Sequence, residues 1–76
     1  MDMNEFIAHF AEQFENTDAS VFTAETRFRE LEEWCSLIAL LVISMVDDEY
    51  GVVLPPEEMR KTQTIQELYD LVQSKL

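Results

Sequence analysis

The sequence predicts a small all-α protein, and three observations support this class. Apolar residues recur at the spacing of helices, whereas strict alternation of apolar and polar residues, which is typical of strands, is hard to find. One glycine and two adjacent prolines leave few positions for hairpin turns. With 76 residues and 47% apolar content, the chain fits one folded domain, residues 1–76, and is unlike a disordered polypeptide.

An apolar stripe near the start of the chain predicts the first helix. Its members lie at i, i+4, i+7 and i+11, with one more residue beside them, and they are Met3, Ile7, Phe10, Phe14 and Phe6. This spacing places the five side chains on one face over roughly three to four turns. We therefore expect a helix that extends to Phe14 and packs against the core.

Residues 16–35 predict a long loop, because helical spacing fades there and turn-forming and capping residues replace it. A loop of this length in a small domain indicates either a functional segment or missed secondary structure, and a short helical turn within it would fit. Phe22, Phe28 and Leu31 are its large apolar residues. Since ordering a loop costs conformational entropy, we expect these three side chains to anchor it to the helices.

The longest uncharged run, Trp34 to Val46, predicts a second helix that begins at Ser36 and ends with Gly51 as a left-handed cap. The run is shorter than the about 20 residues that a membrane-spanning helix needs, so we expect no membrane insertion. We expect the core face to consist of Ala39, Val42, Ile43, Val46 and Tyr50.

The opposite side of this helix carries further apolar residues. At 100° per residue, Ile38, Leu41 and Met45 point away from the expected core face. They would then form a contiguous apolar strip in contact with water, which is typical of a docking surface.

Two more helices are predicted near the end of the chain. Pro55 and Pro56 open a short one of roughly two turns, with acidic residues at its start and basic residues at its end. Thr64 and Glu67 have the spacing of a capping box at the start of a last helix. The apolar stripe of this last helix consists of Ile65, Leu68, Tyr69 and Val72.

A set of local motifs runs through the chain in a fixed order: Phe28, Leu31, Trp34-Cys35-Ser36-Leu37, Asp47 to Val52, Pro55, Thr64-Ile65 and Leu68. With the helix order, the small size and the acidic charge, this pattern resembles the acyl carrier protein family over essentially the whole chain. The resemblance implies a small four-helix bundle with three longer helices, a short third helix, and a long loop between helices 1 and 2.

The resemblance also implies a role for Ser36. In the family, the serine of an Asp-Ser-Leu motif carries 4′-phosphopantetheine, and Ser36 is the residue that matches it. Cys35 stands where the family usually has Asp. Coenzyme A and a phosphopantetheinyl transferase would supply the arm, which would carry acyl groups as thioesters in fatty acid, polyketide or related biosynthesis. The chain would then be a carrier protein and not an enzyme.

On residue type alone, Ser36 has a second interpretation. Serine is a favoured N-cap, because its hydroxyl accepts a hydrogen bond from a free backbone N–H group. Capping and attachment of the arm are compatible, since a phosphate at a helix start is favoured by the helix dipole.

The charge balance limits the partners. Sixteen acidic and five basic residues give a net charge of −11, which repels nucleic acid and anionic membrane surfaces. We expect a monomer whose partners, acyl-transfer and synthase enzymes with basic patches, are steered by Asp47 and Asp48. The expected contact residues on the second helix are Leu37, Ile38, Leu41 and Met45. The alternative is an acidic helical interaction module that binds one partner, or itself, through the apolar strip and has no prosthetic group.

The remaining reactive residues give little support to other chemistry. Cys35 has no partner for an internal disulfide and no secretory leader opens the chain, so we expect a cytoplasmic location and an inert thiol. His9 has no second Cys or His at ligand spacing, which argues against a zinc site and a Cys–His nucleophile pair. Asp47-Asp48-Glu49 lacks the alternate ligands and central glycine of a calcium loop, so no metal site is expected.

Overall fold

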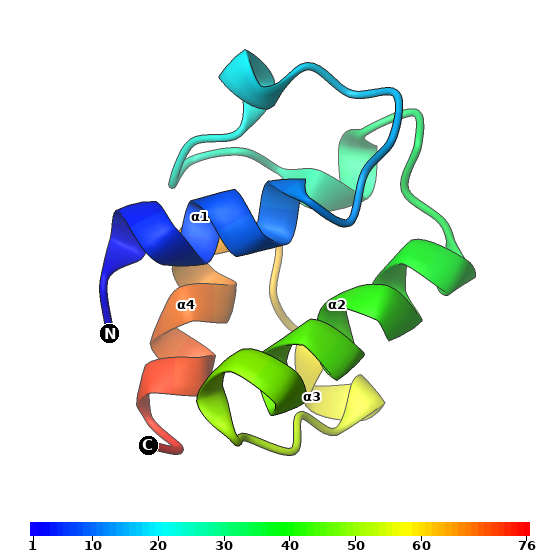
Figure 1. Cartoon of the computed structure of the whole chain (residues 1–76). Coiled ribbons are helices and arrows are strands. Elements are labelled where there is room, and N and C mark those ends of the chain that lie inside the picture. Colours follow the sequence, from blue (N-terminus) through cyan, green and yellow to red (C-terminus); the bar gives the residue numbers. More distant parts are fainter.

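The computed structural model describes residues 1–76 and contains helices and connecting segments but no β-strand (Figure 1). The α-helices are α1 (Met3–Ala11), α2 (Ser36–Tyr50), α3 (Pro56–Met59) and α4 (Ile65–Gln73). Two 3₁₀ turns, Ala19–Val21 and Phe28–Glu30, lie in the long loop between α1 and α2. The prediction of an all-α chain with four helices and a short third one is confirmed.

The helix α1 is shorter than predicted. It ends at Ala11, and the N–H of Phe14 donates to the Ala11 carbonyl oxygen in a turn at 3.0 Å. The next backbone N–H groups, of Glu15 and Asn16, donate to the carboxylate of Glu33 at 2.8 and 3.0 Å. Glu33 thus supplies the acceptors that a longer helix would have provided. Phe14 is nevertheless buried, so its predicted place in the core is confirmed.

The loop between α1 and α2 is fixed to the start of α4. The carbonyl oxygens of Ala24 and Thr26 accept hydrogen bonds from the N–H groups of Gln66 and Ile65, at 2.8 and 3.2 Å. The first N–H groups of a helix have no partner within the helix, so the loop provides acceptors that α4 itself lacks. This loop is therefore an integral part of the fold.

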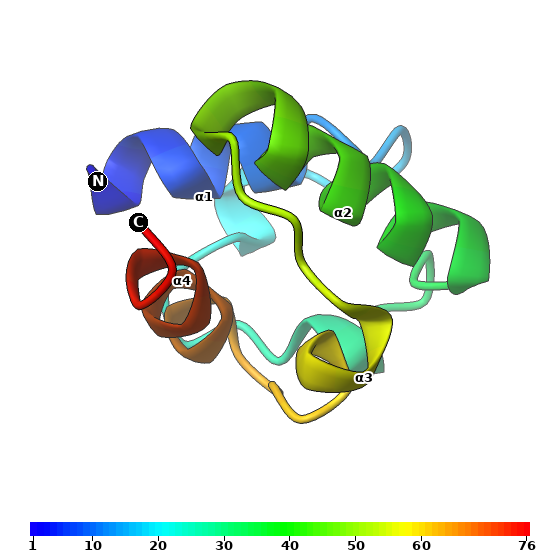
Figure 2. The same cartoon turned by 90° about the horizontal axis from the view of Figure 1, so that it is seen from below.

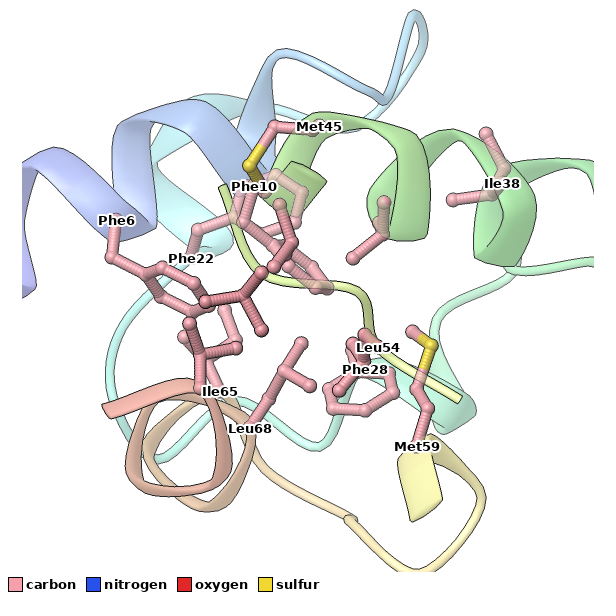
Figure 3. Packing of buried hydrophobic residues seen from close by; sticks show 14 of the residues in the cluster. Phe6, Phe10, Phe22, Phe28, Ile38, Met45, Leu54, Met59, Ile65 and Leu68 are labelled. Carbon is pink, nitrogen blue, oxygen red and sulfur yellow. The ribbon is translucent and has the colours of Figure 1, made fainter. Parts of the chain in front are cut away.

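The core is one cluster of buried apolar side chains from all four helices and the loop (Figure 3). Phe10 of α1 packs against Phe28 of the loop, with ring centroids 5.4 Å apart, and Phe14 packs against Phe22 at 4.9 Å. Phe22 and Phe28 are buried and Leu31 is partly buried against the cluster. The prediction that these three residues anchor the loop is confirmed.

The buried face of α2 differs from the predicted one. Val42 and Val46 are buried as expected. Ile38 and Met45, however, are only 7% and 6% exposed, so the prediction that they form an exposed apolar strip is wrong. Of that strip, only Leu41 is exposed, at 40%.

The reason for this error is the composition of the helix. Apolar residues occupy nearly every side of α2 from Leu37 to Val46, so no charged residue marks where the core face ends. The buried residues lie at i, i+4, i+7 and i+8 from Ile38, which is a regular helical face rotated from the expected one. Ala39, Ile43 and Tyr50, which were expected on the core face, are only partly buried against the cluster.

The predicted ends of the helices agree with the structure, apart from α1 and α3. Gly51 ends α2 with φ of 66°, a left-handed conformation that favours glycine, and its N–H donates to the Asp47 carbonyl oxygen at 2.9 Å. Thr64 and Glu67 form the capping box at the start of α4. The helix α3 has four residues, about one turn instead of two.

The arrangement of the helices brings α3 close to the start of α2. The helix α1 packs against both α2 and α4. After Gly51 the chain turns back, so that α3 lies alongside the first half of α2 (Figure 2). None of the helices combines the length and the apolar character that crossing a membrane would require.

Candidate functional site at the start of α2

Ser36 is the first residue of α2, and its side chain is exposed. The preceding residue, Cys35, occupies the N-cap position with an extended backbone, and its carbonyl oxygen accepts from the Ala39 N–H at 3.0 Å. Cys35 is also exposed. The interpretation of Ser36 as the N-cap is therefore wrong, because the cap is one residue earlier.

The Ser36 hydroxyl is free. It takes part in none of the side-chain hydrogen bonds within the chain. Most buried polar groups of folded proteins are hydrogen-bonded, whereas an exposed hydroxyl has water as its partner. Nothing in the fold therefore holds this oxygen away from a reagent in solution.

A hollow of about 520 Å³ opens beside Ser36, between the start of α2 and α3. Its volume lies in the range of about 300–1,000 Å³ that is typical of small-molecule sites. Most of its wall is apolar and comes from the end of the loop, from α2 and from α3, chiefly Trp34, Ala39, Leu40, Ile43 and Met59. Two arginines, Arg29 and Arg60, complete the lining, and none of the lining residues is acidic.

Arg29 is held in a fixed position at this hollow. Its Nε donates to the Thr62 carbonyl oxygen and its Nη2 to the Met59 carbonyl oxygen, each at 2.8 Å. Its guanidinium also lies over the ring of Phe28, 5.6 Å from the ring centroid. Two hydrogen bonds and one ring contact leave this group little freedom to move.

Neither arginine of the hollow is paired with a carboxylate. The ion pairs of the chain use Arg27 and Lys75, and the carboxylates near His9 are those of Glu12 and Glu49. Two arginines without a carboxylate partner therefore lie beside the start of α2, although the net charge of the chain is −11.

An exposed apolar patch lies on α2 next to this site. Leu37, Leu40 and Leu41 are 63%, 60% and 40% exposed, and their spacing places them on one side of the helix. We refer to these three residues as the leucine face. Asp48 lies on the same side of the helix, about three turns after Leu37, and is exposed. Asp47 is exposed next to Asp48.

The structure thus rearranges the predicted contact surface. It brings together Leu37, Leu41 and Asp48, and it removes Ile38 and Met45, which are buried. Leu40 also belongs to this surface, although it is not among the contact residues predicted from the sequence. The signal for it is its i+3 spacing from Leu37, which places both residues on one side of the helix. Leu41 and Asp48 also border a smaller hollow of about 290 Å³ between α2 and the residues that follow α1.

Arg29 and Arg60 are functional candidates that the sequence alone does not reveal. Arg29 belongs to the loop and precedes Ser36 by seven residues, whereas Arg60 follows α3 and is 24 residues after Ser36. The structure brings the two arginines to one hollow, where Arg29 donates hydrogen bonds to the carbonyl oxygens of Met59 and Thr62.

His9 takes no part in this site. Its Nδ1 lies 3.6 Å from a Glu12 oxygen, and its Nε2 lies 3.7 Å from a Glu49 oxygen, so it connects α1 with the second half of α2. No group of three His, Cys, Asp or Glu side chains is arranged to hold a metal ion.

Comparison of the chain with protein-family models, curated proteins and solved structures finds no match.

Proposed function

We propose that the protein is an acyl carrier and that Ser36 bears a 4′-phosphopantetheine arm. The observation that carries this proposal is the exposed hydroxyl of Ser36, free of hydrogen bonds, at the first turn of a long helix. When bound, the arm supplies a thiol that holds acyl groups as thioesters. The first N–H groups of α2 and the positive end of its dipole favour a phosphate at this position.

The surroundings of Ser36 support the same proposal. Arg29 and Arg60 line the adjacent hollow, and no acidic side chain does. These two cations offset, near Ser36, the repulsion that the acidic chain exerts on a phosphodiester. The proposal includes the arrangement of the four helices as a carrier-type bundle, for which the packing of α1 against α2 and α4 is the support.

The chain itself offers no group to activate Ser36. The single histidine, His9, lies beside Glu12 and Glu49 and does not line the hollow at Ser36. We propose that a phosphopantetheinyl transferase modifies Ser36 and that the chain carries cargo rather than catalysing a reaction. Its acyl-transfer and synthase partners would contact the leucine face and be attracted by Asp47 and Asp48. A reducing, cytoplasmic location and a monomeric state belong to the same proposal.

The direct test is modification by a transferase. The purified chain is incubated with coenzyme A and a broad-specificity phosphopantetheinyl transferase, and its intact mass is measured in the presence of a reductant. The reductant matters because the exposed Cys35 could otherwise form a mixed disulfide with coenzyme A. We expect a gain of one phosphopantetheine unit.

Two serine variants serve as matched controls. Ser44→Ala removes another exposed hydroxyl of α2 and should keep the gain, whereas Ser36→Ala should lose it. Cys35→Asp introduces the residue that the family usually has at this position. This variant shows whether a missing mass gain is due only to a transferase that rejects cysteine before the serine. If neither the wild-type chain nor Cys35→Asp gains mass, the carrier proposal is wrong.

A second function is supported by the leucine face. An acidic interaction module without a prosthetic group would bind a partner through Leu37, Leu40 and Leu41. Such a module does not need Ser36. Partner affinity that is unchanged by Ser36→Ala, together with no mass gain, would favour this function.

A further inference from the structure

We propose that the hollow beside Ser36 selects acyl cargo that ends in a carboxylate over cargo of the same length that ends in a methyl group. This inference rests on the proposed function, because it concerns an acyl group tethered at Ser36. It adds a chemical class of cargo, which neither the motifs of the sequence nor the carrier role specifies.

The first argument is the set of donors that Arg29 leaves unused. A guanidinium has five N–H donors, and Arg29 uses one on Thr62 and one on Met59. Its Nη1 makes no hydrogen bond and no ion pair within the chain. Since the two hydrogen bonds fix the plane of the group, the remaining donors are held in place before a ligand arrives.

The second argument is charge. Arg29 is half-buried, and neither it nor Arg60 has a carboxylate partner, although the chain contains sixteen acidic residues. A carboxylate that enters the hollow would form charge-assisted hydrogen bonds with Arg29, and such bonds are stronger than neutral ones. A methyl group at the same place would make no use of these donors.

The third argument is the shape and lining of the hollow. Trp34, Ala39, Leu40 and Ile43 provide an apolar wall for the methylene groups between the thioester and the carboxylate. Arg29 reaches the hollow from the loop and Arg60 from the end of α3. The hollow thus combines an apolar wall with two arginines. This combination matches half-thioesters of short dicarboxylic acids, in which methylene groups separate the thioester from a free carboxylate.

The net charge of −11 opposes any free anion, so the untethered affinity is expected to be low. A tether changes this balance, because a short flexible linker gives an effective concentration in the millimolar range. Even a weak site is then substantially occupied by cargo that is attached to Ser36. The selectivity should accordingly appear in the loaded protein.

The test compares two matched cargoes on the intact chain. The transferase loads Ser36 with glutaryl- or pentanoyl-4′-phosphopantetheine from the corresponding coenzyme A thioester; the two acyl groups have the same number of carbon atoms and differ in the terminal group. The readout is the NMR chemical shift of the Arg29 Nε–H and of the backbone amides of Leu40, Ile43 and Met59. We expect the glutaryl cargo to shift the Arg29 signal at least twofold more than the pentanoyl cargo does.

Variants at Arg60 and Lys61 separate a specific site from general charge. Both residues are exposed basic side chains that follow α3, but only Arg60 lines the hollow. Arg60→Gln should reduce the difference between the two cargoes, whereas Lys61→Gln should leave it unchanged. Arg29 itself is left intact because it also holds the end of α3.

Each outcome has a distinct meaning. If intact mass shows that Ser36 is loaded neither in the wild type nor in Cys35→Asp, the proposed function fails and the inference fails with it. If loading succeeds but both cargoes shift Arg29 equally, or the pentanoyl cargo shifts it more, only the inference is overturned. An equal effect of Arg60→Gln and Lys61→Gln would also overturn it.

Discussion

Arg29 donates a hydrogen bond from Nη2 to the carbonyl oxygen of Met59, at a distance of 2.8 Å, and thereby joins the long loop to the end of α3. A helix of four residues has little stability of its own, so its position depends on contacts of this kind. Because α3 forms one side of the hollow beside Ser36, the shape of the candidate site depends on a residue of the loop.

Replacement of Arg29 by Met should destabilise the protein. The Met59 and Thr62 carbonyl oxygens would lose a charged donor, and we expect the free energy of unfolding to fall by about 1–3 kcal/mol. Urea denaturation measures this change. Arg27→Met is the control, because Arg27 is 61% exposed and its only ion pair is 4.0 Å long, so its effect should stay below about 0.5 kcal/mol. Equal effects of the two substitutions would contradict the role of Arg29.

Glu33 should make the stability of the loop dependent on pH. Its carboxylate accepts hydrogen bonds from the Thr17 hydroxyl at 2.7 Å and from the N–H groups of Glu15 and Asn16, and these bonds lower the pKa of Glu33 from its usual 4.5. The folded state therefore binds the proton more weakly than the unfolded state does. The stabilisation is present above pH 4.5 and is lost as the pH falls through the lowered pKa of the folded state.

Comparison of Glu33→Gln with the wild type tests this dependence. The variant should be less stable above pH 4.5, and the difference in the free energy of unfolding should shrink as the pH is lowered. Glu32→Gln changes an exposed neighbour without hydrogen bonds and should show no such trend. A difference between Glu33→Gln and the wild type that does not vary with pH would be incompatible with these bonds.

Alanine substitutions at two neighbouring positions test the orientation of α2. Ile38 is 7% exposed and Leu37 is 63% exposed. We expect Ile38→Ala to reduce the free energy of unfolding by about 2–5 kcal/mol, and Leu37→Ala to change it by less than about 0.5 kcal/mol. The reverse order in thermal or urea denaturation would show that α2 is rotated relative to the structure described above.

The leucine face should matter for partners and not for stability. In the transferase reaction, Leu37→Gln with Leu41→Gln should lower kcat/KM roughly tenfold, because the apolar contact is lost while the fold is kept. Asp47→Asn with Asp48→Asn should instead reduce the salt dependence of kcat/KM, since these exposed carboxylates act in long-range attraction. Unchanged kinetics in both double variants would exclude this face as the docking surface.

The end of α2, the start of α4 and the anchors of the loop were well predicted from the sequence because local chemistry determines them. Gly51 supplies a left-handed cap, Thr64 and Glu67 complete a capping box, and Phe22 and Phe28 are the only large aromatic side chains available to hold the loop before Trp34. The end of α1 was not predictable in this way. The carboxylate of Glu33 accepts hydrogen bonds from the N–H groups of Glu15 and Asn16 there. These bonds join the two ends of the loop, so no local pattern indicates them.

The site was only partly predictable, for two physical reasons. Along α2 the apolar residues are nearly continuous and do not mark one face. Ile38 and Met45 were therefore predicted to be exposed, although they are buried. The hollow depends on a contact between Arg29 and Met59 that joins distant segments, so no local spacing indicates it. Ser36 itself was found because its sequence neighbours form a pattern, and the structure adds that Cys35 is the cap and that the Ser36 hydroxyl is free.

The most direct test of the carrier role is to locate the modification within the chain. After the transferase reaction, the chain is digested under reducing conditions, and fragment masses assign the added phosphopantetheine to a single residue. We expect the addition on Ser36 and none on Cys35 or Ser44. A chain that stays unmodified, as wild type and as Cys35→Asp, or that is modified elsewhere, would contradict the central claim that Ser36 is the attachment point of the arm.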